Sequence, residues 1–196
     1  MISCNGKAAA GSQNGNQGDA KASKNLIVYF SHSGMTYMPG GFVDMKEGNT
    51  MQMARKIQAI VGGDLLRIEA VKPYPHDYDE CCDVAKAEHD RGQRPAISTK
   101  VPANMAEYDT VYVGYPIWWG TFPMPVFTFL EQCDLSGKTV VPFSTNEGSG
   151  WGESLSDIAK CCPKSDIAEG LELRGHAVAS SDAAIASWLK RITAKR

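Results

Sequence analysis

The chain has 196 residues but no basic run, no long apolar segment and no closely spaced pair of metal-binding cysteines. A nucleic-acid groove needs clustered Lys and Arg, whereas here the formal net charge is −2 and the basic residues are dispersed. No segment approaches the roughly 20 apolar residues that span a bilayer. None of the six cysteines has the C-x-x-C spacing of a zinc or thioredoxin-like site. These absences argue against a nucleic-acid partner, a membrane span and a cysteine-based metal centre.

Two catalytic signatures are also missing. A serine hydrolase needs a G-x-S-x-G elbow, and a dinucleotide-binding dehydrogenase needs G-x-G-x-x-G after its first strand. The chain has neither. The paired cysteines Cys81-Cys82 and Cys161-Cys162 fall in predicted helices, where neighbouring side chains point to different faces. We therefore expect free thiols in a reducing compartment.

The first 24 residues are small and polar, which predicts a disordered tail ahead of one domain at 25–196. Met1-Ile-Ser-Cys4 followed by such a tether resembles the end of a bacterial lipoprotein signal, without its positive and apolar regions. The tail carries a net charge of +2, which leaves −4 on the domain. Two locations stay open. One is the cytoplasm, and the other is the cell envelope, with a lipid anchor at Cys4 if the true N-terminus is longer.

From residue 25 the pattern alternates between strands and helices. Strands are expected at 25–30, 65–69, 110–113, 138–144 and 167–173. Helices are expected at 49–61, 76–91, 123–132, 153–161 and 182–192. This alternation predicts an α/β three-layer sandwich with a parallel sheet and right-handed crossovers. The less apolar second strand suits an edge, and Pro142 predicts a bulge or a missing ladder bond in the fourth strand.

Three loops at strand ends have compositions that fit one ligand. Ser31-His-Ser-Gly34 follows the first strand, and Gly48-Asn-Thr50 opens a helix whose N-terminus favours a phosphate. Adjacent tryptophans, Trp118 and Trp119, follow the third strand and can stack on a flat ring. The polar loop Ser144–Gly150 follows the fourth strand and is rich in backbone donors. Open α/β sheets bind ligands at this edge, so the loops together predict a pocket for flavin mononucleotide (FMN).

The segments Ile27–Gly34 with Gly48–Thr50, Tyr108–Thr121 and Leu135–Gly150 resemble the flavodoxin family. The resemblance is to the branch of short flavodoxin-like proteins that carry a Gly-Tyr-Pro-x-Trp-Trp-Gly motif. It implies a flavodoxin-like three-layer sandwich with a five-stranded parallel sheet of order 2-1-3-4-5, and tight non-covalent FMN.

The resemblance also implies roles for individual residues. Phosphate binding would fall to Ser31, Ser33, Gly48, Asn49 and Thr50. The isoalloxazine would be flanked by Pro116, Ile117, Trp118, Trp119 and Gly120, with one tryptophan against its face. Its far side would be lined by Thr145, Asn146, Gly148, Ser149 and Gly150. No catalytic residue and no metal ligand is implied.

Two departures from the family pattern stand out. The phosphate loop is interrupted by 14 residues, Met35–Gly48, whose Pro39 and Gly40-Gly41 suit an irregular path. This segment is more apolar than a free loop needs, so it is expected to fold over the flavin or to meet a partner, with a passive insertion as the alternative. The second departure is Asn146, where related proteins often carry a histidine.

Several functions remain open on this fold. A response-regulator receiver has the same strand order but needs acidic residues after the first strand, where Ser31-His32 stand. The leading expectation is electron transfer through bound FMN to a redox partner protein or a small acceptor. An NAD(P)H-dependent FMN or quinone oxidoreductase is the alternative, and a flavin-free binding module is the second alternative.

Overall fold

In the computed structural model, which describes residues 24–194, the apolar run Asn25–Phe30 forms a strand (β1) inside a parallel sheet. Its side chains are buried alternately on two faces, as expected for a strand covered on both sides. The other strands of the sheet are β4 (Asp64–Ile68), β5 (Thr110–Pro116), β6 (Thr139–Asn146), β7 (Asp166–Ile167) and β8 (Leu171–Arg174). The order β4-β1-β5-β6-β7 confirms the predicted order 2-1-3-4-5, with the second strand at the edge.

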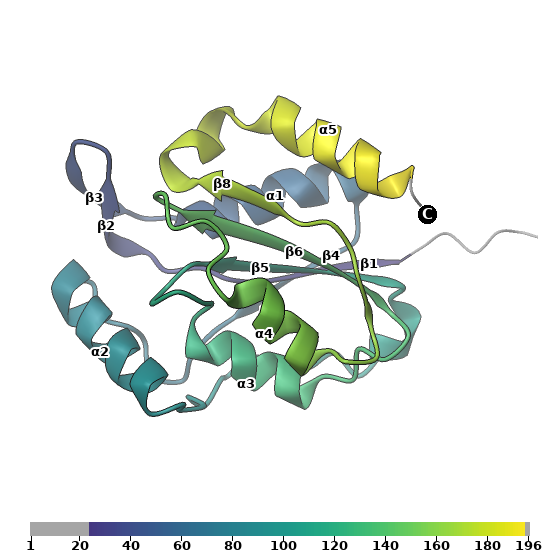
Figure 1. Ribbon diagram of the computed structural model, residues 1–196, viewed down its shortest axis with the longest axis horizontal. Helices are drawn as coiled ribbons and strands as arrows, with labels where there is room; N and C mark the ends of the chain where they lie inside the picture. Colours follow the sequence, from purple (N-terminus) through teal and green to yellow (C-terminus); the bar gives the residue numbers. More distant parts are fainter. Residues whose placement is uncertain (1–23, 195–196) are drawn as a thin grey trace, which may run out of the picture.

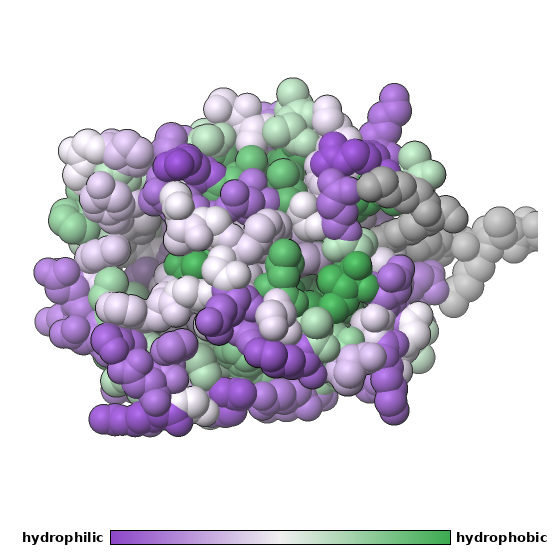
Figure 2. All heavy atoms as spheres, in the orientation of Figure 1, coloured by the Kyte–Doolittle hydropathy of each residue, from purple (hydrophilic) through white to green (hydrophobic). Residues whose placement is uncertain are grey.

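Helices cover both faces of the sheet (Figure 1). They are α1 (Asn49–Val61), α2 (Tyr78–Asp90), α3 (Met124–Gln132), α4 (Ser154–Cys161) and α5 (Asp182–Thr193), with the short 3₁₀ helices η1 (Met105–Glu107) and η2 (Gly175–Ser180). One core layer packs α1 and α5 on Ile27, Tyr112 and Phe143. The other packs α3 and α4 on Val28, Val113 and Val140. Hydrophilic side chains cover the outer surface of α2 (Figure 2).

The prediction of a single fifth strand at 167–173 is wrong in its detail. Two short strands replace it: β7 pairs with β6 at Thr139–Val140, and β8 pairs with β6 from Phe143 onward. The ladder is interrupted opposite Pro142, which has no N–H to offer. Gly170 lies in the gap, where an added Cβ would come within 2.7 Å of the Pro142 carbonyl oxygen. Pro142 of β6 therefore lies opposite the break between β7 and β8.

The inserted segment is also more regular than expected. It forms an antiparallel hairpin of β2 (Gly34–Met38) and β3 (Gly41–Met45), whose turn contains Pro39 and Gly40. Figure 1 shows the hairpin beside α2 at the carboxyl end of the central sheet. The N–H of Met35 donates to the His76 carbonyl oxygen at 2.8 Å, which ties the hairpin to the residues that open α2. Gly40 and Gly41, which suggested an irregular path, instead form part of the hairpin turn and its flank.

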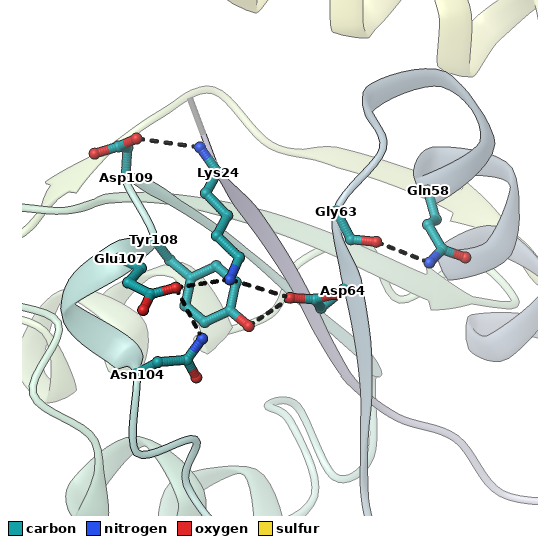
Figure 3. A network of polar contacts seen from close by, with 8 residues as sticks. All are labelled: Lys24, Gln58, Gly63, Asp64, Asn104, Glu107, Tyr108 and Asp109. Atoms are coloured by element: carbon teal, nitrogen blue, oxygen red, sulfur yellow. Dashed lines mark hydrogen bonds and ion pairs between the residues drawn. The ribbon is translucent and has the colours of Figure 1, made fainter. Parts of the chain in front are cut away.

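The opposite end of the sheet is closed by a polar network around Lys24 (Figure 3). Its ammonium Nζ lies 2.9 Å from Glu107 Oε2 and 3.8 Å from Asp64 Oδ2, and its backbone N–H donates to Asp109. The Tyr108 hydroxyl donates to the same Asp64 carboxylate at 2.6 Å. These contacts hold the start of β1 against β4 and η1.

The expected tail lies, apart from Lys24, outside the described residues, and so does Cys4. The five cysteines in the described part of the chain are free thiols. Over residues 24–194, every helix lacks the length and apolar character needed to cross a membrane.

Candidate functional site

Two adjoining cavities lie at the carboxyl ends of β1, β5 and β6, where the sequence places its three loops. Each cavity is small, with volumes of about 100 and 170 Å³. Six residues line both: Thr36, Asn49, Tyr78, Pro116, Trp118 and Thr145. We treat the two as one cavity with an α1 end and a loop end.

The α1 end of the cavity is the start of a helix. Helix α1 begins after Gly48, which has no side chain to cap it, and no acidic residue lies in its first turn. Apart from the N–H of Met51, the first-turn N–H groups keep the unsatisfied donors and partial positive charge of a helix N-terminus. Ser31 Oγ accepts the N–H of Met51 at 3.1 Å, and Thr50 Oγ1 lies 2.8 Å from Thr145 Oγ1. These bonds join the helix start to the ends of β1 and β6.

Gly48 stands where no side chain fits. A Cβ at this position would lie 2.1 Å from the His32 carbonyl oxygen and 2.5 Å from Ser31 Oγ. Its φ of −66° is available to every residue, so the requirement for glycine is one of space. The helix start is consequently pressed against the loop that leaves β1, although the hairpin separates the two in sequence.

The adjacent tryptophans have different environments because a tight turn divides them. Trp118 and Thr121 exchange backbone hydrogen bonds of 2.8 and 3.2 Å, and Trp119 and Gly120 between them both have positive φ. Positive φ at both central residues is the geometry of a type I′ turn. Trp118 packs edge-on against Phe30 and lines the cavity.

Trp119 is directed to α2 instead. Its Nε1–H donates to the Cys82 carbonyl oxygen at 3.1 Å, and the Lys86 ammonium lies 5.2 Å from its ring centroid. The side chain stays 46% exposed and does not line either cavity. The sequence left open which tryptophan faces the ligand, and the geometry favours Trp118.

Asn146 organises the loop after β6. Its Oδ1 accepts the N–H groups of Gly148 and Gly150 at 2.7 and 3.3 Å, while its Nδ2 donates to Glu172 on β8. The backbone donors that made this loop attractive for a ligand are therefore partly used within the loop. The side-chain amide of Asn146 therefore holds this loop in place by hydrogen bonds to its backbone.

The structure brings together most of the residues expected at the site. Around the cavity lie Ser31, Gly48, Asn49, Thr50, Pro116, Ile117, Trp118, Thr145 and Asn146. Away from it lie Trp119, Gly120, Gly148, Ser149 and Gly150, and Ser33 lines a neighbouring hollow beside Arg67. Glu147 lies in the predicted loop Ser144–Gly150, and the residues missed from the sequence are His32, Met35, Thr36, Tyr37, Tyr78 and Gly175. Only the apolar character of the insertion pointed to any of them.

His32 is a titratable group that lines the α1 end of the cavity. Its ring meets Trp118 edge-on at 5.8 Å, and within residues 24–194 its buried Nε2 has no hydrogen-bond partner. Burial lowers the pKa of His32 below its ordinary value, and the nearby His76 and Arg67 lower this pKa further. The folded protein therefore favours the neutral imidazole.

We expect this histidine to make stability depend on pH. A lowered folded-state pKa means that the unfolded chain binds the proton more readily, so the stabilisation is complete above about pH 6.5 and is lost as the pH falls below it. His32→Phe keeps the edge contacts, and its melting temperature should fall less than that of the wild type between pH 7 and pH 5. Thermal scans check this, with the exposed His89→Gln as control. Parallel curves for wild type and His32→Phe would contradict it.

A second prediction concerns Thr50. Thr50→Val removes the hydroxyl at the helix start but keeps the shape, and hydrogen bonds to charged groups contribute about 1.5–3 kcal/mol. FMN affinity should therefore fall about tenfold or more, while the affinity for riboflavin, which lacks the phosphate, should change little. Fluorescence titration of both ligands measures this, with Thr193→Val on α5 as control. Equal losses for the two ligands would place the phosphate elsewhere.

Comparisons with known proteins agree with this geometry. The family model described as Flavodoxin matches residues 42–192. A candidate flavoprotein from Bacteroides eggerthii is 35% identical with a TM-score of 0.70, over 87% of this chain and 98% of that chain. One from Bacteroides uniformis is 30% identical with a TM-score of 0.68, over 87% of this chain and 99% of that chain.

A more distant structure shares the fold. It is a flavoprotein from Lactobacillus acidophilus in complex with FMN, 22% identical with a TM-score of 0.62, over 81% of this chain and 98% of that chain. No curated protein matches the chain by sequence. The family model covers most of the chain, and the predicted strand order is observed. The chain therefore belongs to the flavodoxin family.

Proposed function

We propose that this protein binds FMN non-covalently and transfers electrons through it to a separate partner. The observation that carries the proposal is the cavity itself, which joins the start of α1 to the Trp118 side chain. One end suits a phosphate and the other suits an aromatic ring. The FMN complex of the Lactobacillus acidophilus protein, which shares the fold, supports the choice of ligand.

The residues present fit this cofactor. The absence of a side chain at Gly48 lets the loop after β1 pack directly against the helix start, which brings Ser31 to the first turn of α1. Of the two helix starts at the cavity, that of α2 is capped by Asp77 and carries acidic residues in its first turn, which leaves the start of α1 for the single phosphate of FMN. The hydroxyls of Thr50 and Thr145 lie beside it and add donors. We infer a mononucleotide site.

The flavin supplies the redox chemistry when bound, and the protein binds and orients it. In this proposal the first-turn amides of α1 hold the phosphate, and the hydroxyl of Thr50 donates to it. Trp118 provides an apolar face, and its own position is held by Phe30 and Tyr74, with ring centroids 5.4 and 5.1 Å away. Because these two contacts fix the Trp118 side chain, it would hold the isoalloxazine ring in one orientation.

Charge around the mouth of the cavity favours a protein partner. Of the 22 acidic and 20 basic residues, six acids and one lysine fall in residues 34–48 and 77–83, which leaves 16 acids and 19 bases elsewhere. These two stretches are the hairpin and the start of α2, and the latter presents a hydrophilic surface (Figure 2). Such an asymmetric distribution steers a basic partner to the acidic side. This favours the electron carrier over an enzyme with a small substrate.

Reconstitution followed by electron-transfer assays tests the proposal. The purified chain should take up FMN in a one-to-one ratio, and heat should release FMN rather than FAD. The reduced protein should reduce the basic haem protein cytochrome c at a rate that falls as salt is added. Failure to bind any flavin would remove the proposed function. Rapid turnover of NADH or NADPH with quinones would favour the oxidoreductase instead.

A further inference from the structure

Tyr78 lines both cavities, although it comes from α2 and from none of the three loops. It is the first residue of the helix and is half-buried. Burial and the neighbouring Cys82 raise the pKa of its phenol to about 12, so the ring is neutral over the physiological range. A neutral aromatic ring at the cavity wall is suited to contact with another aromatic ring.

The remaining walls offer few alternatives. The loop after β6, where the family resemblance placed the far side of the ring, has Trp151 as its aromatic residue, and this side chain packs against Tyr115 in the core and lines neither cavity. Trp119 is bonded to α2, as described above. The aromatic side chains that line the cavities in the described chain are therefore His32, Tyr37, Tyr78 and Trp118. Of these, Tyr78 and Trp118 line both.

Three contacts hold Tyr78 in place. Asp77 caps α2 by accepting the N–H of Glu80 at 3.0 Å, which fixes the first turn. The Phe42 ring of the hairpin lies 4.9 Å from the Tyr78 ring at an interplanar angle of 52°. Met35 bonds to His76, two residues before Tyr78. The hairpin thus supports the residue from the solvent side, and Phe42 itself stays 54% exposed.

We propose that Tyr78 is the second aromatic side chain that contacts the isoalloxazine, in partnership with Trp118, and that Phe42 positions it. The inference rests on the proposed function, because it assumes that a flavin binds in this cavity. It assigns the inserted hairpin a role in cofactor binding, although the hairpin interrupts the phosphate loop. It also places the second wall on α2 rather than on the loop after β6.

Titration of flavins against Tyr78 variants tests the proposal. Tyr78→Leu should weaken FMN and riboflavin by the same factor, about tenfold, because ring contacts do not involve the phosphate. Tyr78→Phe should bind both ligands within about twofold of the wild type. Flavin fluorescence, which a stacked aromatic ring quenches, should be higher for bound FMN in Tyr78→Leu. Trp119→Leu, an aromatic change outside the cavity, is the matched control.

The role of Phe42 needs a separate measurement. Phe42→Leu should weaken both flavins to a smaller extent. The double variant with Tyr78→Leu should bind no more weakly than Tyr78→Leu alone, since Phe42 acts through Tyr78. Additive losses would show that Phe42 contacts the ligand or the fold independently, which would overturn the positioning role.

Three outcomes would overturn the assignment of Tyr78. One is that Tyr78→Leu binds both flavins within twofold of the wild type. Another is a loss for FMN alone, which would place Tyr78 at the phosphate. A third is unchanged fluorescence of bound FMN in Tyr78→Leu. Far-UV circular dichroism of the cofactor-free variants verifies folding, and Tyr78→Met provides a second apolar replacement. If the wild type itself binds no flavin, the proposed function fails, and this result is distinct from a failure of the Tyr78 assignment alone.

Discussion

Gly48→Ala should reduce FMN affinity about a hundredfold or more, because a misfit of ~3 kcal/mol at the helix start acts directly on the phosphate contacts. The added Cβ would lie 2.1 Å from the His32 carbonyl oxygen, a backbone atom that cannot rotate away. Either the loop after β1 or the first turn of α1 must move, and both form the α1 end of the cavity. Fluorescence titration with FMN and riboflavin measures the loss, which should be larger for FMN.

Gly175→Ala is the matched control for this change. Its Cβ would meet Asn49 Nδ2 at 2.2 Å and Glu147 Oε1 at 2.7 Å, which are the ends of side chains. Side-chain ends can shift, so we expect a loss of only about a fewfold. Thermal unfolding of both variants without cofactor separates general destabilisation from a local effect. An FMN affinity in Gly48→Ala close to that of the wild type would show that the phosphate does not bind at this helix start.

Trp118→Ala should lower FMN affinity ten- to a hundredfold, since stacking of a flat base on an aromatic ring contributes ~1–3 kcal/mol. Trp119→Ala should leave it within about threefold. The two residues are adjacent, yet the turn at 118–121 directs one to the cavity and the other to α2. Riboflavin should follow FMN in both variants, because the ring carries the contact.

The stability of the cofactor-free protein provides the check on this pair. Trp118 packs against Phe30 and Tyr74, so its removal should also lower the melting temperature. Trp118→Phe keeps a ring and should recover most of the flavin affinity. If Trp119→Ala proved the more damaging to FMN binding, the turn would have to open on loading, and the cavity described here would not be the flavin site.

The sequence was most informative about the sheet. Strands buried on both faces read as continuous apolar runs, and helix starts and stops follow from glycine, proline and amphipathic spacing. Those local signals gave the bounds of β1 and α1 without error. They did not separate β7 from β8, because the break depends on Pro142 of the neighbouring strand. A strand boundary set by another strand has no local signature.

The part of the site that lies at strand ends was predictable from the sequence, whereas the part contributed by α2 and the hairpin was not. Strand ends meet at one edge of a parallel sheet, so Ser31, Thr50, Trp118 and Thr145 could be grouped from their positions. The approach of α2 and the hairpin depends on contacts between distant segments, such as Met35 with His76. Tyr78 was missed for this reason. The direction of Trp119 depends on a positive φ, which its residue type disfavours.

The direction of β1 has a consequence for how the molecule can be attached to other structures. The strand starts at Asn25 beside the Lys24 network and runs for six residues toward the cavity, a span of ~20 Å at about 3.3 Å per residue. A support, tag or fused domain joined ahead of Lys24 therefore meets the protein at the end of the sheet remote from the cavity. Immobilised in this way, the molecule presents its mouth to the solution, whereas coupling through the hairpin would cover it.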